Sequence, residues 1–142
     1  MNSWYDIRFL DEGERSLDMD GANRNSARIQ EALHEEIKAM GGDESKVFLG
    51  GFSQGCAMAL HNGLGREKLG GVIGLSGYLL PGTKVPENIP PTLLIHGEDD
   101  PMIDLRMAMK TYQRGGLINK KNVHFHKVGN LGHSINMEVL QL

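Results

Sequence analysis

The chain has 142 residues, with 15 basic and 18 acidic side chains and a formal net charge of −3. This length is typical of one domain, so residues 1–142 are predicted to form a single domain. The weakly acidic balance excludes the basic surface that nucleic-acid binding needs, and no nucleic-acid partner is predicted. No apolar run approaches the ~18 residues of a membrane span, so no stable membrane insertion is expected.

The single cysteine, Cys56, has no partner for an internal disulfide. Such a chain is typical of a reducing compartment. The first six residues carry neither the basic nor the apolar segment of a secretion signal. We therefore expect a cytoplasmic protein.

The N-terminal part of the chain shows a polar segment and then helical periodicity. Residues 8–21 are polar and acidic, which predicts a loop. Over residues 23–40, apolar side chains recur at helical spacing and predict a helix, with a left-handed terminus at Gly41-Gly42. The run 46–52 is apolar without alternation, which predicts a strand buried on both faces of a parallel sheet.

Strands and helices then alternate to the end of the chain. Apolar runs predict further strands at residues 71–76, 92–96 and 123–128, and helices are predicted at 54–64, 104–114 and from 134 onward. Residues 78–91, which contain four of the five prolines, predict a loop. This alternation indicates the α/β class, with a mostly parallel sheet flanked by helices.

The segment Gly51-Phe52-Ser53-Gln54-Gly55 lies between a predicted strand and a predicted helix. In that context G-x-S-x-G is typical of a nucleophile elbow, a sharp turn that projects the serine hydroxyl beyond the sheet. The glycines leave room for the turn, and N–H groups at the helix start face a developing oxyanion. Because a free serine hydroxyl is a poor nucleophile, Ser53 needs a nearby base. The competing interpretation is an ordinary serine in a glycine-rich turn.

Two further polar segments follow later strands. His96-Gly97-Glu98-Asp99-Asp100-Pro101 comes after one strand, and one of its three acids could orient a histidine. Gly129-Asn130-Leu131-Gly132-His133-Ser134 comes after the next, and a histidine on such a loop can act as general base. Taken singly, the acidic segment is equally compatible with a solvated turn, and a lone histidine on a loop is more often a surface residue. The order serine, acid, histidine is that of α/β-hydrolases, and it favours the catalytic interpretation.

The histidines outside these segments and the cysteine are not predicted to take part in catalysis or metal binding. His124 and His126 share a strand face, but no further ligand stands at metal-site spacing, so a metal site is not predicted. His34 and His61 fall on predicted helices, where surface or packing roles are expected. Cys56 is expected to pack behind the elbow rather than to react.

Taken together, the motifs resemble those of the acyl-protein thioesterase / lysophospholipase / carboxylesterase family of α/β-hydrolases. The matching segments are residues 3–7, 49–55, 75–79, 96–101 and 132–133, in the family's order over nearly the whole chain. The resemblance implies that Ser53 is the nucleophile, Asp100 the acid and His133 the base. Asp100 is chosen over Glu98 and Asp99 because the acid of the family precedes this proline.

The resemblance also implies a setting for the reaction. The backbone amide of Gln54 would donate to the oxyanion, Trp4 would lie near the acyl site, and Leu75 and Ser76 would line the floor beside the triad. The implied activity is that of a serine esterase or thioesterase acting through an acyl-enzyme. Its partner would be an acyl ester, a lysophospholipid or an S-acylated protein, with no cofactor; a homodimer is left open.

The sequence departs from the family at its beginning. The family's further N-terminal strands, and a His-Gly-x-Gly loop that supplies a second oxyanion donor, have no counterpart here. We therefore expect a partial α/β-hydrolase fold that lacks the N-terminal strands and has an unpaired apolar sheet edge. Since losing one oxyanion donor costs about 10²–10³ in kcat, weak or no activity of the chain alone is expected. Wild-type-like turnover of a short-chain aryl ester would contradict this.

Three other functions remain open. The chain could be a generic carboxylesterase without a protein substrate, or a catalytically impaired fragment that acts by binding alone. Cys56 as nucleophile is the third, disfavoured because it lies beyond the elbow.

Overall fold

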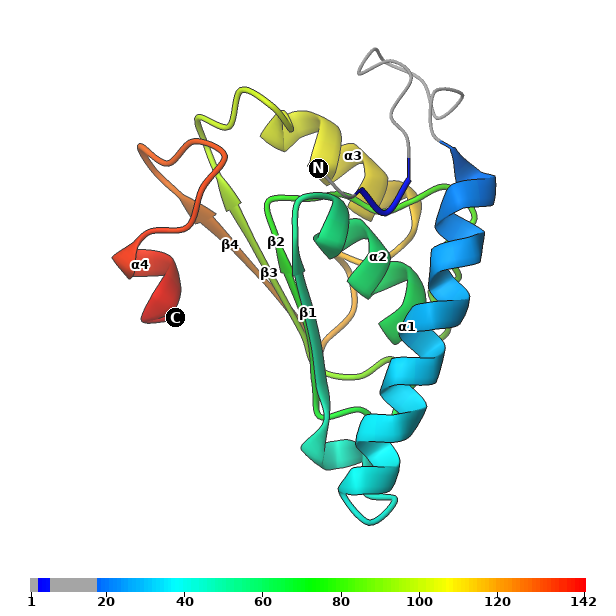
Figure 1. Cartoon of the computed structure of the whole chain (residues 1–142). Coiled ribbons are helices and arrows are strands. Elements are labelled where there is room, and N and C mark those ends of the chain that lie inside the picture. Colours follow the sequence, from blue (N-terminus) through cyan, green and yellow to red (C-terminus); the bar gives the residue numbers. More distant parts are fainter. Residues whose placement is uncertain (1–2, 6–17) are drawn as a thin grey trace.

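The computed structural model describes residues 3–5 and 18–142, which form a parallel sheet with flanking helices (Figure 1). The strands are β1 (Phe48–Phe52), β2 (Gly71–Leu75), β3 (Thr92–Gly97) and β4 (Val123–Val128). The helices are α1 (Met19–Ala39), α2 (Gln54–Gly63), α3 (Leu105–Arg114) and α4 (Met137–Leu140), with a 3-10 turn η2 (Glu44–Lys46) before β1. The predicted α/β class and its alternation of elements are confirmed.

The sheet follows chain order, β1-β2-β3-β4, and every neighbouring pair of strands is parallel. One row of side chains across it runs from Phe52 through Leu75 and Ile95 to His126. Parallel strands bring all their carboxyl ends to one edge, so the turns after β1, β2, β3 and β4 meet there. The predicted loop at 78–91 contains no helix or strand.

The two faces of the sheet are covered unequally. Leu94 of β3 packs in the larger core cluster with residues of α1, α2 and α3, such as Leu33, Met58 and Tyr112. Neighbouring residues of a strand point to opposite faces, so Ile95 joins the smaller cluster of Val128, Leu131 and Val139 on the side of α4 (Figure 1). The face toward α4 is therefore the thinly covered one.

Strand β1 differs from the prediction. A strand buried on both faces was expected from residue 46, but β1 begins at Phe48 and has an alternating pattern, with Phe48 61% and Phe52 37% exposed. Lys46 belongs instead to η2, which Asp43 caps by accepting from the N–H of Ser45. Within the described residues β1 pairs with β2 alone, and its exposed side chains point to the thinly covered face. Burial of β1 on both faces was therefore wrongly predicted.

Helix α1 begins earlier than predicted. The loop expected at 8–21 is wrong for its last three residues, which already belong to α1; most of that range lies outside the described residues. Asp18 is the N-cap and accepts from the N–H of Gly21 at 2.9 Å. A Cβ on Gly21 would collide with the Asp18 carboxylate, so this glycine is part of the cap. The far end follows the prediction, with positive φ at Gly41 and Gly42.

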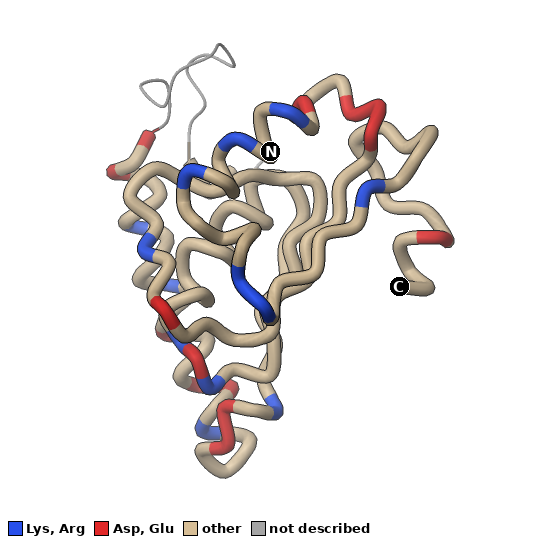
Figure 2. Tube along the Cα trace, turned by 180° about the vertical axis from the view of Figure 1, so that it is seen from behind, with Lys and Arg blue, Asp and Glu red and all other residues tan. Residues whose placement is uncertain are grey.

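Charged residues of both signs are interspersed along the helices and turns of the described chain (Figure 2). None of the helices in residues 3–5 and 18–142 combines the length and apolar composition that a bilayer crossing requires.

Candidate active site

Ser53 occupies a strained turn between β1 and α2. Its φ is 58° and its ψ is −118°, a left-handed conformation that non-glycine residues rarely adopt. The backbone N–H of Ser53 donates to the Leu75 carbonyl at 2.8 Å, which ties the turn to the end of β2. A Cβ on Gly51 would collide with the Gly55 carbonyl, so only glycine lets the chain fold back this tightly. The expected elbow geometry is present.

A chain of two hydrogen bonds joins Ser53, His133 and Asp100. The Nδ1 atom of His133 lies 2.7 Å from Oδ2 of Asp100, and its Nε2 lies 2.9 Å from Oγ of Ser53. Because the carboxylate only accepts, Nδ1 carries the proton, and the serine hydroxyl donates to Nε2. The three residues come from three different turns at the carboxyl edge of the sheet. The structure thus brings them together in the predicted geometry, while their roles in a reaction stay a prediction.

The turn after β3 fixes the carboxylate of Asp100, whose side chain is fully buried. Its Oδ1 accepts from the backbone N–H groups of Met102 at 2.9 Å and Ile103 at 2.8 Å. These bonds leave Oδ2 facing His133. The neighbouring acids, Glu98 and Asp99, are exposed, and His133 makes its carboxylate contact with Asp100.

Two residues to which the sequence pattern assigned no role lie against this chain of bonds. The Phe52 ring packs beside the His133 ring, with centroids 4.7 Å apart and planes tilted by 42°. The buried ring of His96 places Nε2 at 3.5 Å from Oδ2 of Asp100. Two features of the sequence could have pointed to these residues. Phe52 directly precedes the serine, and His96 lies near the end of a strand, four residues before Asp100.

Gln54 and Trp4 meet through their polar groups. The backbone N–H of Trp4 donates to the side-chain oxygen of Gln54 at 3.2 Å. The side-chain nitrogen of Gln54 donates in turn to the backbone carbonyl of Tyr5 at 2.8 Å. Asn25 of α1 also donates to the Trp4 carbonyl, at 2.5 Å. Gln54 is the first residue of α2, so its backbone N–H lies at the positive end of that helix. The side chain of Gln54 therefore anchors the segment of Trp4 to the elbow.

Leu75 and Ser76 lie beside Ser53 at the end of β2. Leu75 is half-buried and supplies the carbonyl that holds the Ser53 N–H. Ser76 is buried, has a φ of 52°, and donates its N–H to the Ile95 carbonyl at 2.8 Å. Both residues thus stand next to the elbow, and their contact with a substrate stays a prediction.

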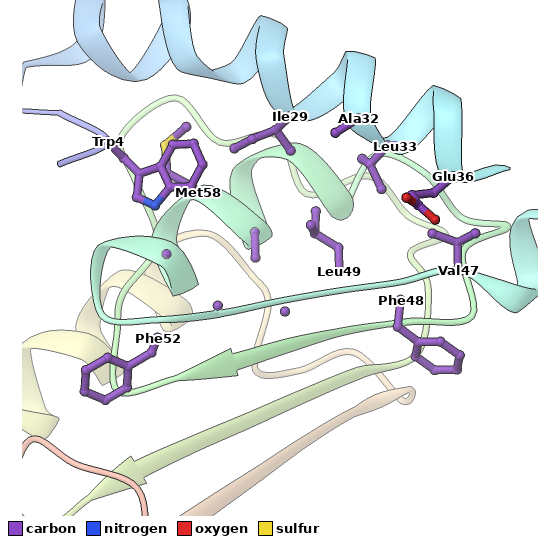
Figure 3. A pocket seen from close by; sticks show the side chains of 14 residues that line it. Trp4, Ile29, Ala32, Leu33, Glu36, Val47, Phe48, Leu49, Phe52 and Met58 are labelled. Atoms are coloured by element: carbon purple, nitrogen blue, oxygen red, sulfur yellow. The ribbon is translucent and has the colours of Figure 1, made fainter. Parts of the chain in front are cut away.

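A mostly apolar groove of about 470 Å³ runs from the elbow along β1 beneath α1 (Figure 3). Trp4, Met58 and Leu33 line its helix side, while Phe52 and Phe48 point away across the strand (Figure 3). Glu36 is its acidic lining residue. Ser53, Asp100 and His133 do not line it, so the groove adjoins the elbow without containing the hydroxyl.

Cys56 is fully buried behind the elbow, as expected for a packing residue. A Cβ on Gly74 or Gly77 would collide with it, and its sulfur lies 3.8 Å from the hydroxyl of Tyr112. Burial raises the pKa of the Cys56 thiol to about 12. The side chain is therefore neither accessible nor ionised near neutral pH, which contradicts the alternative in which it is the nucleophile.

The remaining histidines have ordinary environments. His34 is exposed, and His61 bonds to the Thr83 hydroxyl at 2.7 Å, in agreement with surface and packing roles. His124 and His126 are exposed on β4. Among the described residues, no group of three or more His, Cys, Asp or Glu side chains is arranged to hold a metal ion.

A serine on a positive-φ turn after a parallel strand, bonded to a histidine and an acid from later strand ends, defines a protein of the α/β-hydrolase class. Over residues 1–142 the chain matches the model of the Phospholipase/Carboxylesterase family. The chain belongs to this family.

Curated relatives carry a consistent name. The chain is 36% identical to acyl-protein thioesterase 1 of Yarrowia lipolytica, with 97% of this chain and 64% of the relative covered. It is also 36% identical to acyl-protein thioesterase 1 of Emericella nidulans, with 94% and 62% covered. The chain thus spans just under two thirds of the length of these relatives.

Solved structures agree on the fold. A crystal structure of a variant of Arabidopsis thaliana SOBER1 superposes with a TM-score of 0.82 at 30% identity, covering 99% of this chain and 71% of that one. Esterase PE8 superposes with a TM-score of 0.79 at 25% identity, covering 97% and 65%. The chain covers only about two thirds of each solved chain, which agrees with the expected partial α/β-hydrolase fold.

Proposed function

We propose that this chain carries the catalytic groups of a serine hydrolase that cleaves acyl thioesters or esters through an acyl-enzyme. The observation that carries the proposal is the continuous chain of bonds from Ser53 Oγ through His133 to Asp100. The names of the relatives, acyl-protein thioesterase and esterase, support the same chemistry.

In the proposed mechanism, Ser53 Oγ attacks the acyl carbonyl while its proton passes to Nε2 of His133. Asp100 holds the Nδ1–H of the ring and stabilises the imidazolium that forms. His133 then returns the proton to the departing thiol or alcohol, which leaves the acyl group on Ser53. Water repeats the attack with His133 again as base, and the acid product leaves Ser53 free.

The oxyanion formed in both steps would sit at the start of α2. The backbone N–H of Gln54 is the proposed donor, since it follows the nucleophile directly and belongs to the first turn of the helix. Among the described residues the Ser53 hydroxyl makes no capping bond to α2, so it remains available to His133. The mechanism requires no metal or organic cofactor.

The proposed substrate is a fatty-acyl thioester on a protein cysteine, as the name of the curated relatives suggests. A mostly apolar groove and an aromatic side chain, Trp4, adjoin the elbow, which suits an apolar acyl chain nearby. The single cysteine favours a cytoplasmic location for the reaction. Comparing hydrolysis of an S-acylated peptide with that of its oxoester analogue distinguishes this substrate from those of a generic carboxylesterase.

The test of the proposed function is covalent labelling with a fluorophosphonate probe, which needs an activated serine but no turnover. The intact chain should label, and Ser53→Ala should abolish labelling. Ser134→Ala is the matched control, because this exposed serine lies directly after His133 and should label like the parent. A parent chain that never labels, or labelling that survives Ser53→Ala, would contradict the proposal and favour a fragment that acts by binding alone.

A further inference from the structure

His96 is a buried polar side chain that the proposed mechanism does not use. It lies on β3 and is 1% exposed. Its Nε2 lies 2.7 Å from the carbonyl oxygen of Ile103. A carbonyl oxygen only accepts, so Nε2 carries a proton and donates it. Among the described residues Nδ1 has no hydrogen-bond partner, so the contacts at Nε2 orient the ring.

The bond from His96 closes a ring of contacts around Asp100. The carbonyl of Ile103 accepts a hydrogen bond from the Nε2–H of His96, and the N–H of Ile103 donates to Oδ1 of Asp100 at 2.8 Å. The same Nε2 lies 3.5 Å from Oδ2, the oxygen that bonds His133. At that distance the contact is an electrostatic attraction rather than a full hydrogen bond. His96 thus contacts the carboxylate directly at one oxygen and, through Ile103, the turn that holds the other.

The burial of both side chains strengthens the electrostatic contact between His96 and Asp100. The side chains of His96 and Asp100 are 1% and 0% exposed, so water does not screen them. In so buried a site the attraction between an N–H dipole and a carboxylate is stronger than it is in water. A carboxylate with two lone-pair sites per oxygen can accept from the backbone, from His133 and from the edge of His96 together.

We propose that His96 is a positioning residue, which sets the Asp100 carboxylate in the orientation that holds the His133 Nδ1–H. The inference rests on the proposed function, since it assigns His96 a part in that same site. His96 touches no reacting atom and acts through Asp100. Its loss should therefore lower the rate at which Ser53 reacts, and leave probe binding unchanged.

The test compares His96→Phe, which keeps a planar ring but removes the donor, with His96→Gln, whose amide nitrogen lies as many bonds from Cβ as Nε2. The rate constant of Ser53 phosphonylation by a fluorophosphonate should fall about 10- to 100-fold in His96→Phe, as for a misplacement of about 1 Å between catalytic groups. The probe concentration at half-maximal rate should not change. His96→Gln should recover most of the rate. His126→Phe, an exposed position on β4, should react like the parent.

A second readout does not depend on reactivity. In protein labelled with ¹⁵N-histidine, the His133 Nδ1–H resonance should be present in the parent and in His96→Gln and lost or broadened in His96→Phe. If the parent does not react with the probe, the proposed function fails, and this resonance alone decides whether His96 positions Asp100. Should His96→Phe not fold, His96→Asn replaces it, because its shorter amide cannot reach the Ile103 carbonyl.

Equal rates in the parent and His96→Phe, or equal losses in His96→Phe and His96→Gln, would overturn the inference. So would a His133 resonance that is unaffected by either change. A role limited to stability would lower the melting temperature and leave the rate constant of the folded protein unchanged.

Discussion

The two loops that carry Asp100 and His133 are built differently. The turn after β3 buries the Asp100 side chain completely and satisfies Oδ1 with two backbone N–H groups of its own residues. The loop after β4 leaves the His133 side chain 18% exposed, and the ring is held by bonds to the other two members and by the Phe52 ring.

This difference assigns the loops different mechanical roles. The acid is held mainly by backbone N–H groups of its own turn, whereas the histidine takes its orientation from side chains of other elements. A change in the β3 turn should therefore impair the base as well, while a change in the β4 loop should leave Asp100 in place. The following substitutions test that asymmetry in order of expected effect.

The largest effect is expected from Asp100→Asn. The amide oxygen can still accept from Met102 and Ile103, so the turn survives, but the amide nitrogen would face the Nδ1–H of His133 and favour the wrong tautomer. The rate of Ser53 labelling should fall by about 10,000-fold, as for the same change in a serine-protease triad. Circular dichroism should show an unchanged fold.

Asp99→Asn is the matched control for the acid. Asp99 is exposed and adjacent, so its neutralisation should change the labelling rate little. A large loss in Asp99→Asn combined with a small one in Asp100→Asn would show that the acid had been assigned to the wrong residue.

Gly97→Ala tests where the two loops touch. A Cβ on Gly97 would collide with the Leu131 carbonyl, so the alanine must push the β4 loop away from the β3 turn. We expect a loss of about 1–3 kcal/mol in the free energy of unfolding, measured by urea denaturation, with slower labelling of Ser53. In Gly129→Ala the new Cβ would meet only Glu98 Oε2 at 3.7 Å, an ordinary contact. If both alanines cost the same, the close approach at Gly97 would not be what matters.

Phe52→Leu probes the looser support of the base. Aromatic pairs contribute about 0.5–1.5 kcal/mol beyond their buried area, so the labelling rate should fall about 2- to 10-fold. Phe48→Leu changes the same residue type on the same face of β1, four positions from Phe52, and should leave the rate unchanged. Equal effects of the two substitutions would mean that Phe52 acts through the strand rather than through His133.

Much of this site was predictable because its determinants are local in the sequence. The glycines around Ser53 indicate a tight turn in any strand-to-helix context, and apolar runs place the turns of Asp100 and His133 at the same sheet edge. The roles of His96 and Phe52 were not predictable in this way. They depend on which side chains become neighbours after the strands pair, and a histidine at a strand end is compatible with many environments.

The errors of the sequence prediction also have physical causes. Apolar composition alone does not tell an edge strand from a central one, so β1 was expected to be buried on both faces. The start of α1 was missed because Asp18 and Gly21 are common in turns, and here they form a helix cap instead. In both places the tertiary environment, rather than local composition, decided the outcome.

The smallest effect is expected from alkylation of Cys56. This thiol lies on α2, fully buried behind the elbow, and its pKa is raised to about 12. Iodoacetamide should therefore leave the native protein unmodified by mass spectrometry and the labelling rate of Ser53 unchanged, while the denatured chain should take up one adduct. If native protein were alkylated and lost its labelling in parallel, Cys56 would be reachable from the reaction centre. The bonds from Ser53 through His133 to Asp100, and the two loops that hold them, would then no longer account by themselves for how Ser53 is activated.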